Sequence, residues 1–213
     1  MLIRFKIILI LFTLSFLFSE EVESKIDVVK NDVEILPDAS LKDLDNKKVN
    51  IYKYLDSKPA LISFWFLACE PCKKEMKYLS EFNSKYEKYG FKVISVNTDN
   101  SRTLNRVKPF VNSKKYTFDV LSDPRSLFFR KMGGIQCPYL VVVDADGNIT
   151  NKHIGYSPGD EIKLEIEIVE LLKDSIVSDT TLTDSSIINI LNSLKKDSVE
   201  NLKKSTSVES IVE

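Results

Sequence analysis

Histidine and cysteine are scarce in this chain of 213 residues, which has three cysteines and one histidine. A zinc site with four cysteine ligands therefore cannot form within one chain. A site of three cysteines and one histidine would need all four residues to converge, and these are Cys69, Cys72, Cys137 and His153. We expect His153 to lie exposed on an edge strand, so no resident metal is predicted.

An excess of either charge is also missing. Lysine and arginine number 30 against 31 aspartates and glutamates, which gives a net charge of −1. No long basic block occurs, so nucleic acid is excluded as a class of partner. The 43% hydrophobic content is enough for one soluble domain with extensions. We find no internal repeat, and no apolar run after residue 20 is long enough to span a membrane.

The first 19 residues predict export. Arg4 and Lys6 precede an apolar run over residues 7–18, and acidic residues follow at 20 and 21. This order is typical of a signal peptide. The run is short for a span of about 20 residues, and Leu17 makes the cleavage site weak. A cleaved signal and a retained anchor both stay open, and either places the domain outside the cytoplasm, where disulfides persist.

The most informative feature is the motif Cys69-Glu-Pro-Cys72. It stands between an apolar strand predicted over residues 60–66 and a helix predicted over residues 70–89. A helix N-terminus stabilises a thiolate through free N–H groups and its dipole, and a thiolate attacks disulfides. The motif therefore favours thiol–disulfide exchange, although half of a zinc site and a structural clip use the same spacing.

The remaining pattern predicts an α/β fold with a mixed sheet covered by helices. We expect these elements in order: strands 41–44 and 49–52 around a polar turn, strand 60–66, helix 70–89, strand 91–96, helix 101–112 limited by Pro109, strand 118–121, helix 126–132, strand 138–143, a turn at 144–147, strand 148–154, and a helix capped at 157–160 and ending near Lys173.

Four segments are expected. Residues 1–19 form the signal or anchor, 20–36 a polar linker, 37–174 the folded domain and 175–213 a polar tail. Within the tail, one apolar stripe predicts a short amphipathic helix that could contact the domain, a partner or another copy. Its residues are Ile187, Ile188, Leu191 and Leu194.

Residues 37–173 resemble the TlpA/ResA branch of the thioredoxin-fold proteins. The resemblance is carried by Phe64-Trp65, by the run from Cys69 to Met76, by Gly134-Ile-Gln-Cys-Pro138 and by residues 143–149. It implies a thioredoxin-like mixed sheet flanked by helices. The N-terminal β-hairpin and the C-terminal helical tail are predicted from the sequence pattern, and the tail lies outside the resemblance. The resemblance also implies an exported or membrane-anchored disulfide reductase, and some members of the family keep the cysteines of apocytochrome c reduced.

The motif residues have distinct predicted roles. Cys69 is the expected nucleophile and Cys72 the resolving cysteine, while Pro71 restrains the turn. Glu70 places a negative charge beside Cys69, which raises the thiol pKa and favours a reductant. Glu75 lies one helical turn after Cys72 and, if buried, could pass protons to the cysteine pair.

Three further residues are expected beside the cysteine pair. Pro138 matches the family's cis-proline, which would expose the backbone of residue 137 to an extended substrate. Cys137 precedes it directly and could form an alternative disulfide or fill apolar space. Trp65 is expected to pack beside the site or to serve as plain core.

We therefore predict an exported disulfide reductase with no cofactor beyond its Cys69–Cys72 disulfide. Its expected partners are protein thiols or disulfides and an upstream membrane dithiol donor. The alternative is a thiolate site for metal binding or delivery, built from Cys69, Cys72 and Cys137.

Overall fold

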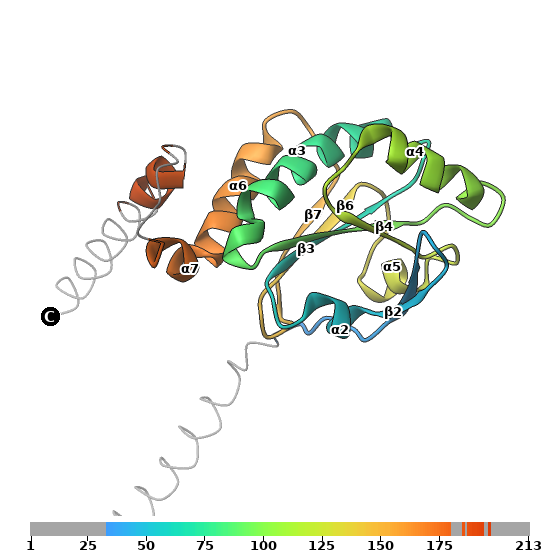
Figure 1. The fold of residues 1–213 in the computed structure, drawn as a ribbon, viewed down its shortest axis with the longest axis horizontal. Coiled ribbons are helices and arrows are strands. Elements are labelled where there is room, and N and C mark those ends of the chain that lie inside the picture. The colour runs from blue at the N-terminus through green and yellow to red at the C-terminus, as the bar shows by residue number, and fades with distance from the viewer. Residues whose placement is uncertain (1–32, 180–184, 186, 194–195, 197–213) are drawn as a thin grey trace, which may run out of the picture. The chain divides into compact units, whose positions relative to one another are not determined.

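The computed structural model describes residues 33–179, 185, 187–193 and 196 (Figure 1). The predicted signal or anchor and residues 20–32 of the predicted linker lie outside the described residues. Within the described part, no helix has the length and apolar character that crossing a membrane requires.

Seven strands form one mixed sheet in the order β2-β1-β5-β4-β3-β6-β7. Their bounds are β1 Ser40–Asp43, β2 Lys48–Asn50, β3 Ala60–Trp65, β4 Lys92–Asn97, β5 Asp119–Ser122, β6 Tyr139–Val143 and β7 Ile149–Ile154. Strands β3, β4 and β5 run parallel, whereas β1, β6 and β7 pair antiparallel with their neighbours. This confirms the predicted α/β class with a mixed central sheet.

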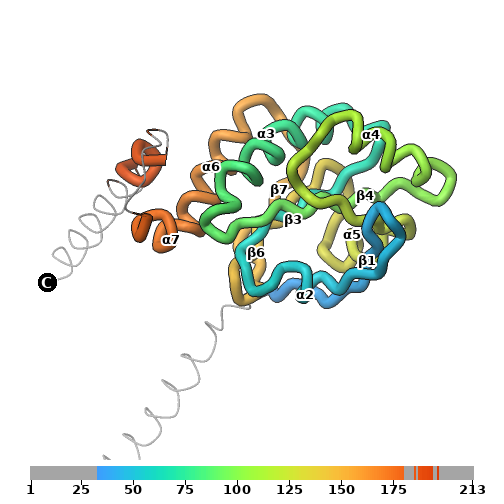
Figure 2. The backbone as a smooth tube through the Cα atoms, viewed as in Figure 1, coloured from blue at the N-terminus to red at the C-terminus, as the bar shows by residue number. Residues whose placement is uncertain are grey.

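Helices cover both faces of this sheet. Their bounds are α2 Ile51–Leu55, α3 Glu70–Tyr86, α4 Val107–Lys114, α5 Leu127–Lys131, α6 Asp160–Leu171 and α7 Lys173–Val177, with 3-10 turns η1 Glu87–Tyr89 and η2 Leu104–Arg106. Helices α3, α4 and α6 contribute to one hydrophobic cluster, and α2 and α5 to the other. Figure 1 shows the first group above the strands and the second below them. The tube in Figure 2 shows α3 and α6 side by side.

Helix α3 has the predicted periodicity. Met76, Leu79, Phe82 and Tyr86 all lie on its buried side. The helix tightens into η1 and ends at Gly90, whose φ of +82° is the left-handed conformation that glycine adopts without strain. The strand-to-helix junction at the cysteine motif is therefore as predicted.

Two local predictions were wrong, and a third was right only in part. The second strand of the N-terminal hairpin ends at Asn50, because the side chain of Asn50 caps α2 by accepting a hydrogen bond from the Lys53 N–H at 3.1 Å. Pro109 does not limit the helix near residue 112 but sits in the first turn of α4, where a missing N–H costs nothing. The cap predicted over residues 157–160 is right in part: the Ser157 N–H donates to the Asp160 carboxylate at 2.8 Å, but Gly159 holds the N-cap position, so Pro158 lies before the helix.

The folded chain begins before the predicted boundary at Pro37. Leu36 is buried in the core, and Ile35 forms a bridge with Asn148 of the β6–β7 turn. The described turns of the tail also join the domain, since Ile187 and Leu191 belong to the same hydrophobic cluster as Ile176 of α7. Of the predicted stripe, Leu194 lies outside the described residues.

The buried position of Ile187 gives a testable prediction. Ile187 is 1% exposed, whereas its neighbour Ile188 is 37% exposed. Ile187→Ala should lower the free energy of unfolding by about 2 to 4 kcal/mol, because it leaves a cavity in the core. The matched variant Ile188→Ala should cost less than about 1 kcal/mol. Equal effects in urea unfolding would contradict docking of the tail through Ile187.

Candidate active site

The cysteine pair forms a disulfide at the first turn of α3. Cys69 is the N-cap residue of this helix, and the backbone N–H of Cys72 donates a hydrogen bond to the Cys69 sulfur at 3.3 Å. The two Cα atoms are 5.3 Å apart. Cys69 keeps 5% of its surface exposed and Cys72 none. Cys69 is thus the more accessible sulfur and lies where the helix N-terminus stabilises an anion.

A buried carboxylate holds the loop that carries Cys69. Asp99 follows β4 and accepts a hydrogen bond from the Leu67 N–H at 2.7 Å. It also accepts from the Asn97 amide at 2.9 Å and from the Thr103 hydroxyl at 2.7 Å. The sequence did not single out this group. The feature that could have identified Asp99 in the sequence is a run of polar residues at the carboxyl end of an otherwise apolar strand.

Glu75 is buried behind the disulfide, one helical turn after Cys72. It is 4% exposed and accepts a hydrogen bond from the Ser63 hydroxyl of β3 at 3.3 Å. Burial raises the pKa of Glu75 to about 8; the Ser63 bond opposes this shift, and the charge of Asp160 adds to it. A carboxyl group with this pKa can take up and release a proton near neutral pH.

Cys137 and Pro138 are joined by a cis peptide bond, in agreement with the resemblance. Cys137 is a free, half-buried cysteine that packs against both hydrophobic clusters. Burial raises the pKa of its thiol to about 11; a hydrogen bond with Thr98 opposes the shift, and the nearby Glu75 adds to it. Cys137 is therefore a neutral thiol close to the buried carboxyl group.

Glu70 is exposed and forms an ion pair with Lys73 at 2.7 Å. The hydrogen bond and charge of Lys73 lower the pKa of Glu70. This pairing offsets part of the negative charge that the sequence placed beside Cys69, so the predicted effect of Glu70 on the thiol is weakened. Pro71 lies exposed in the first turn of α3, where proline fits the helix.

Trp65 is fully buried and belongs to the same hydrophobic cluster as Cys69 and Cys72. Its ring lies 5.7 Å from that of Phe110 in α4, between centroids. The backbone C=O of Trp65 accepts a hydrogen bond from the Thr98 N–H at 2.8 Å. Trp65 is thus a core residue that supports the loop of the cysteine pair from below.

The structure offers no support for the metal-binding alternative. Across residues 33–179 and the described tail residues, no group of three histidine, cysteine, aspartate or glutamate side chains is placed to hold a metal ion. His153 lies on the edge strand β7, as predicted, but it is half-buried rather than exposed, and its Nε2 is 2.8 Å from the Glu167 carboxylate. The high pKa of Cys137 also disfavours the thiolate that a metal needs.

Comparison with known proteins identifies the relatives of this fold and site. The family model described as Redoxin matches residues 30–168. The thiol-disulfide oxidoreductase ResA of Bacillus thuringiensis (strain Al Hakam) is 31% identical over 127 residues, which cover 60% of this chain and 72% of that protein.

Solved structures agree with this match. A thioredoxin-like protein from Porphyromonas gingivalis is 33% identical with a TM-score of 0.58, covering 65% of this chain and 92% of that one. StoA from Bacillus subtilis has a TM-score of 0.51 at 22% identity and covers 61% of this chain and 96% of that one. The latter likeness shows the thioredoxin-like fold alone.

The buried carboxyl group makes stability depend on pH. The pKa of Glu75 is about 8 in the folded chain and ordinary, 4.5, when unfolded. The folded state therefore binds more protons between these values, so this stabilisation is present below pH 4.5 and is lost as pH rises through 8. We expect the free energy of unfolding of the oxidised protein to fall by up to about 4 kcal/mol between pH 5 and 8.

Glu75→Gln should flatten this dependence in denaturant titrations, because the amide cannot ionise. The matched control is Glu81→Gln, an exposed glutamate of the same helix, which should keep the wild-type profile. A Glu75→Gln profile as steep as that of the wild type would show that another group is responsible.

Proposed function

The chain belongs to the Redoxin family and is a thiol–disulfide oxidoreductase of the ResA type, and from this premise we propose that it is an exported reductase of protein disulfides. The observation that carries the proposal is the arrangement of the Cys69–Cys72 disulfide at the start of α3 with the buried carboxyl group of Glu75 one turn below it.

The first step uses the reduced form of the pair. The Cys69 thiolate, stabilised by the N-terminus of α3, attacks one sulfur of a substrate disulfide. A bond forms between Cys69 and that sulfur, the substrate S–S bond breaks, and the second substrate sulfur leaves as a thiolate that takes up a proton. The product of this step is a mixed disulfide through Cys69.

The second step needs a proton acceptor near Cys72, which is fully buried. Glu75 in its ionised form accepts the proton of the Cys72 thiol, because the two residues are one helical turn apart on the buried side of α3. The Cys72 thiolate then attacks Cys69 and releases the second substrate thiol. The substrate gains two electrons and two protons, and the enzyme is left as the disulfide.

The surroundings of the pair favour a reductant. Cys72 is fully buried, which disfavours a thiolate there, and Glu75 disfavours it further whenever it is ionised, so the reduced form is destabilised. A dithiol of this kind gives its electrons away readily. It must then be reduced again by an upstream dithiol donor, which we place in the membrane.

An extended polypeptide fits the surface beside the cysteines. Within residues 33–179, the backbone N–H and C=O of Cys137 form no hydrogen bond, so both can pair with a substrate strand. Ile135 is 79% exposed, and Phe66 is 37% exposed in the loop before Cys69. These features support a protein substrate, and cysteines of apocytochrome c are the family expectation. Residues 1–19 support export as a signal peptide or an anchor.

Catalysis by this pair can be tested by dithiol-dependent reduction of insulin. The wild type should accelerate insulin precipitation, whereas Cys69→Ser should reduce the rate to that of the dithiol alone, because the remaining Cys72 is fully buried and cannot reach the substrate disulfide. Cys72→Ser should accumulate a mixed disulfide with the substrate that mass spectrometry assigns to Cys69. The control is the double variant, which keeps only Cys137 and should trap nothing. Trapping through Cys137 would contradict the assignment of the nucleophile.

The direction of electron flow follows from the equilibrium potential of the Cys69–Cys72 couple. Thiol trapping across a dithiothreitol series at pH 7 should give a value near that of thioredoxin, about −270 mV. A value near that of DsbA, about −120 mV, would identify an oxidant and would overturn the proposal of a reductase.

A further inference from the structure

A cavity of about 790 Å³ opens on the domain away from the cysteine pair, between β1, the β5–α5 connection and α5. Its shape follows from the backbone. Strands β1 and β5 pair at only two positions, Lys42 with Ser122 and Asp43 with Leu121. The Ser122 hydroxyl closes the pairing by donating to the Lys42 C=O at 3.0 Å. Beyond this point the two chains diverge around the cavity.

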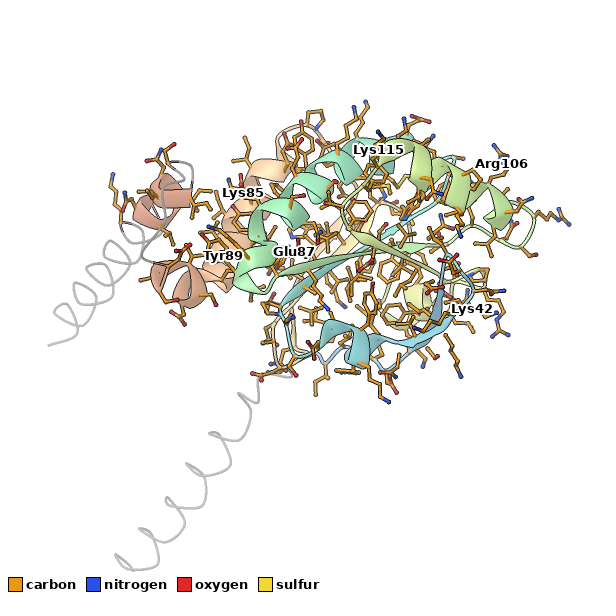
Figure 3. All side chains as sticks on the ribbon, in the orientation of Figure 1. Lys42, Lys85, Glu87, Tyr89, Arg106 and Lys115 are labelled. Carbon is orange, nitrogen blue, oxygen red and sulfur yellow. A yellow bond between two sulfur atoms is a disulfide. The ribbon has the colours of Figure 1, made fainter. Side chains whose placement is uncertain are left out.

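Four cations line this cavity, and they are Lys42, Arg125, Arg130 and Lys131. None forms an ion pair with any residue that the structure describes. Lys42 donates only to the amide oxygen of Asn46 at 2.8 Å, and Lys131 only to the C=O of Asp38 at 3.5 Å. Figure 3 labels Lys42 at the hairpin end of the sheet. In a chain with a net charge of −1, this is a local excess of positive charge.

The single carboxylate of the lining does not neutralise these cations. Asp123 is 5% exposed and accepts hydrogen bonds from the backbone N–H groups of Leu127 and Phe129, both at 2.9 Å. Both carboxylate oxygens of Asp123 are thus hydrogen-bonded to the backbone at the start of α5. The nearby acidic turn is also engaged, since Asp45 pairs with Lys108.

Apolar side chains lie between the cations. Leu41 and Phe128 are buried in the lining, while Leu127 is 46% exposed. Leu127 is therefore free to contact an apolar group of a bound ligand. The lining therefore suits a ligand that carries both carboxylates and apolar groups.

The cavity shares an edge of the sheet with the cysteine pair. Because β3, β4 and β5 are parallel, Cys69 after β3 and Asp123 after β5 both lie at their carboxyl ends. Strands β3 and β1 are three positions apart in the sheet, which corresponds to roughly 10 to 15 Å at the usual strand spacing. An extended chain covers this sideways span with about three to five residues. A longer segment is needed to reach Cys69, because the cavity lies on the α5 side of the sheet and Cys69 belongs to the cluster on the α3 side.

We propose that this cavity is a docking site for an extended segment of a partner protein in which acidic and apolar side chains alternate. The four unpaired cations attract the carboxylates, and the leucine-lined floor takes the apolar side chains. A partner seated here can extend past the carboxyl ends of the strands toward Cys69, so the site selects partners by charge before their disulfide or dithiol meets the cysteine pair.

The test measures binding to the oxidised protein and needs no turnover. A fluorescein-labelled peptide of alternating glutamate and leucine should bind at 50 mM salt, and its Kd should rise at least tenfold at 500 mM salt. Arg125→Glu with Arg130→Glu should raise the Kd at least tenfold. The matched control, Arg125→Lys with Arg130→Lys, keeps the charges and should stay within threefold of the wild type, which separates lost charge from a perturbed α5.

Three outcomes would overturn the proposal: no binding of this peptide at 50 mM salt, equal binding of a peptide of alternating lysine and leucine, or an unchanged Kd in the double glutamate variant. Binding of phosphatidylglycerol vesicles without binding of the peptide would also overturn it, in favour of a membrane surface. Insulin reduction by the double glutamate variant should stay within twofold of the wild type. If the wild type binds no peptide but reduces insulin, the docking site is rejected and the proposed reductase still stands.

Discussion

Helix α3 packs its apolar side flat against the central sheet, from Cys72 at one end to Tyr86 at the other. This packing determines the chemistry of the site, because the same side of the helix carries Glu75 into the core. A carboxyl group in that place loses its hydration and gains only the Ser63 hydroxyl in return. At neutral pH the carboxyl group of Glu75 is therefore mostly protonated, next to the disulfide.

The disulfide itself depends on a second constraint, the hydrogen bonds of Asp99. Its carboxylate connects the end of β4 to the loop after β3 through the Leu67 N–H. The Thr98 N–H meets the Trp65 C=O in the same region. These bonds hold the loop so that Cys69 arrives at the N-terminus of α3 in the N-cap position. Rigid support of this kind keeps a nucleophile within bonding distance of its resolving partner.

The sequence predicted the central layer and the redox pair but not every element around them. Two elements can be recognised directly in the sequence. A strand buried on both faces, such as residues 60–66, is apolar at nearly every position, and a helix buried along one side, such as α3, has apolar residues at steps of three and four. Glu75 and the cis bond before Pro138 came from the resemblance to a family. Helix α2 was mistaken for strand because five residues are too few for a helical period to show. The docking cavity gathers side chains from three separate segments, and only the fold brings them together.

The cysteine pair after β3 and the cavity beyond β5 have opposite electrostatic requirements. A cation beside Cys69 would stabilise its thiolate and make the pair a stronger oxidant. Lys73, which follows Cys69 by one helical turn, is instead paired with Glu70. Attraction of an acidic partner needs unpaired cations. These cations lie beyond β5, and their distance from the cysteine pair is comparable to or greater than the Debye length, which is about 8 Å at physiological salt. Salt therefore screens the field of these cations before it reaches the sulfurs, but not before it reaches a partner seated in the cavity. The attraction of a partner and the redox potential of the cysteine pair can then change independently of each other.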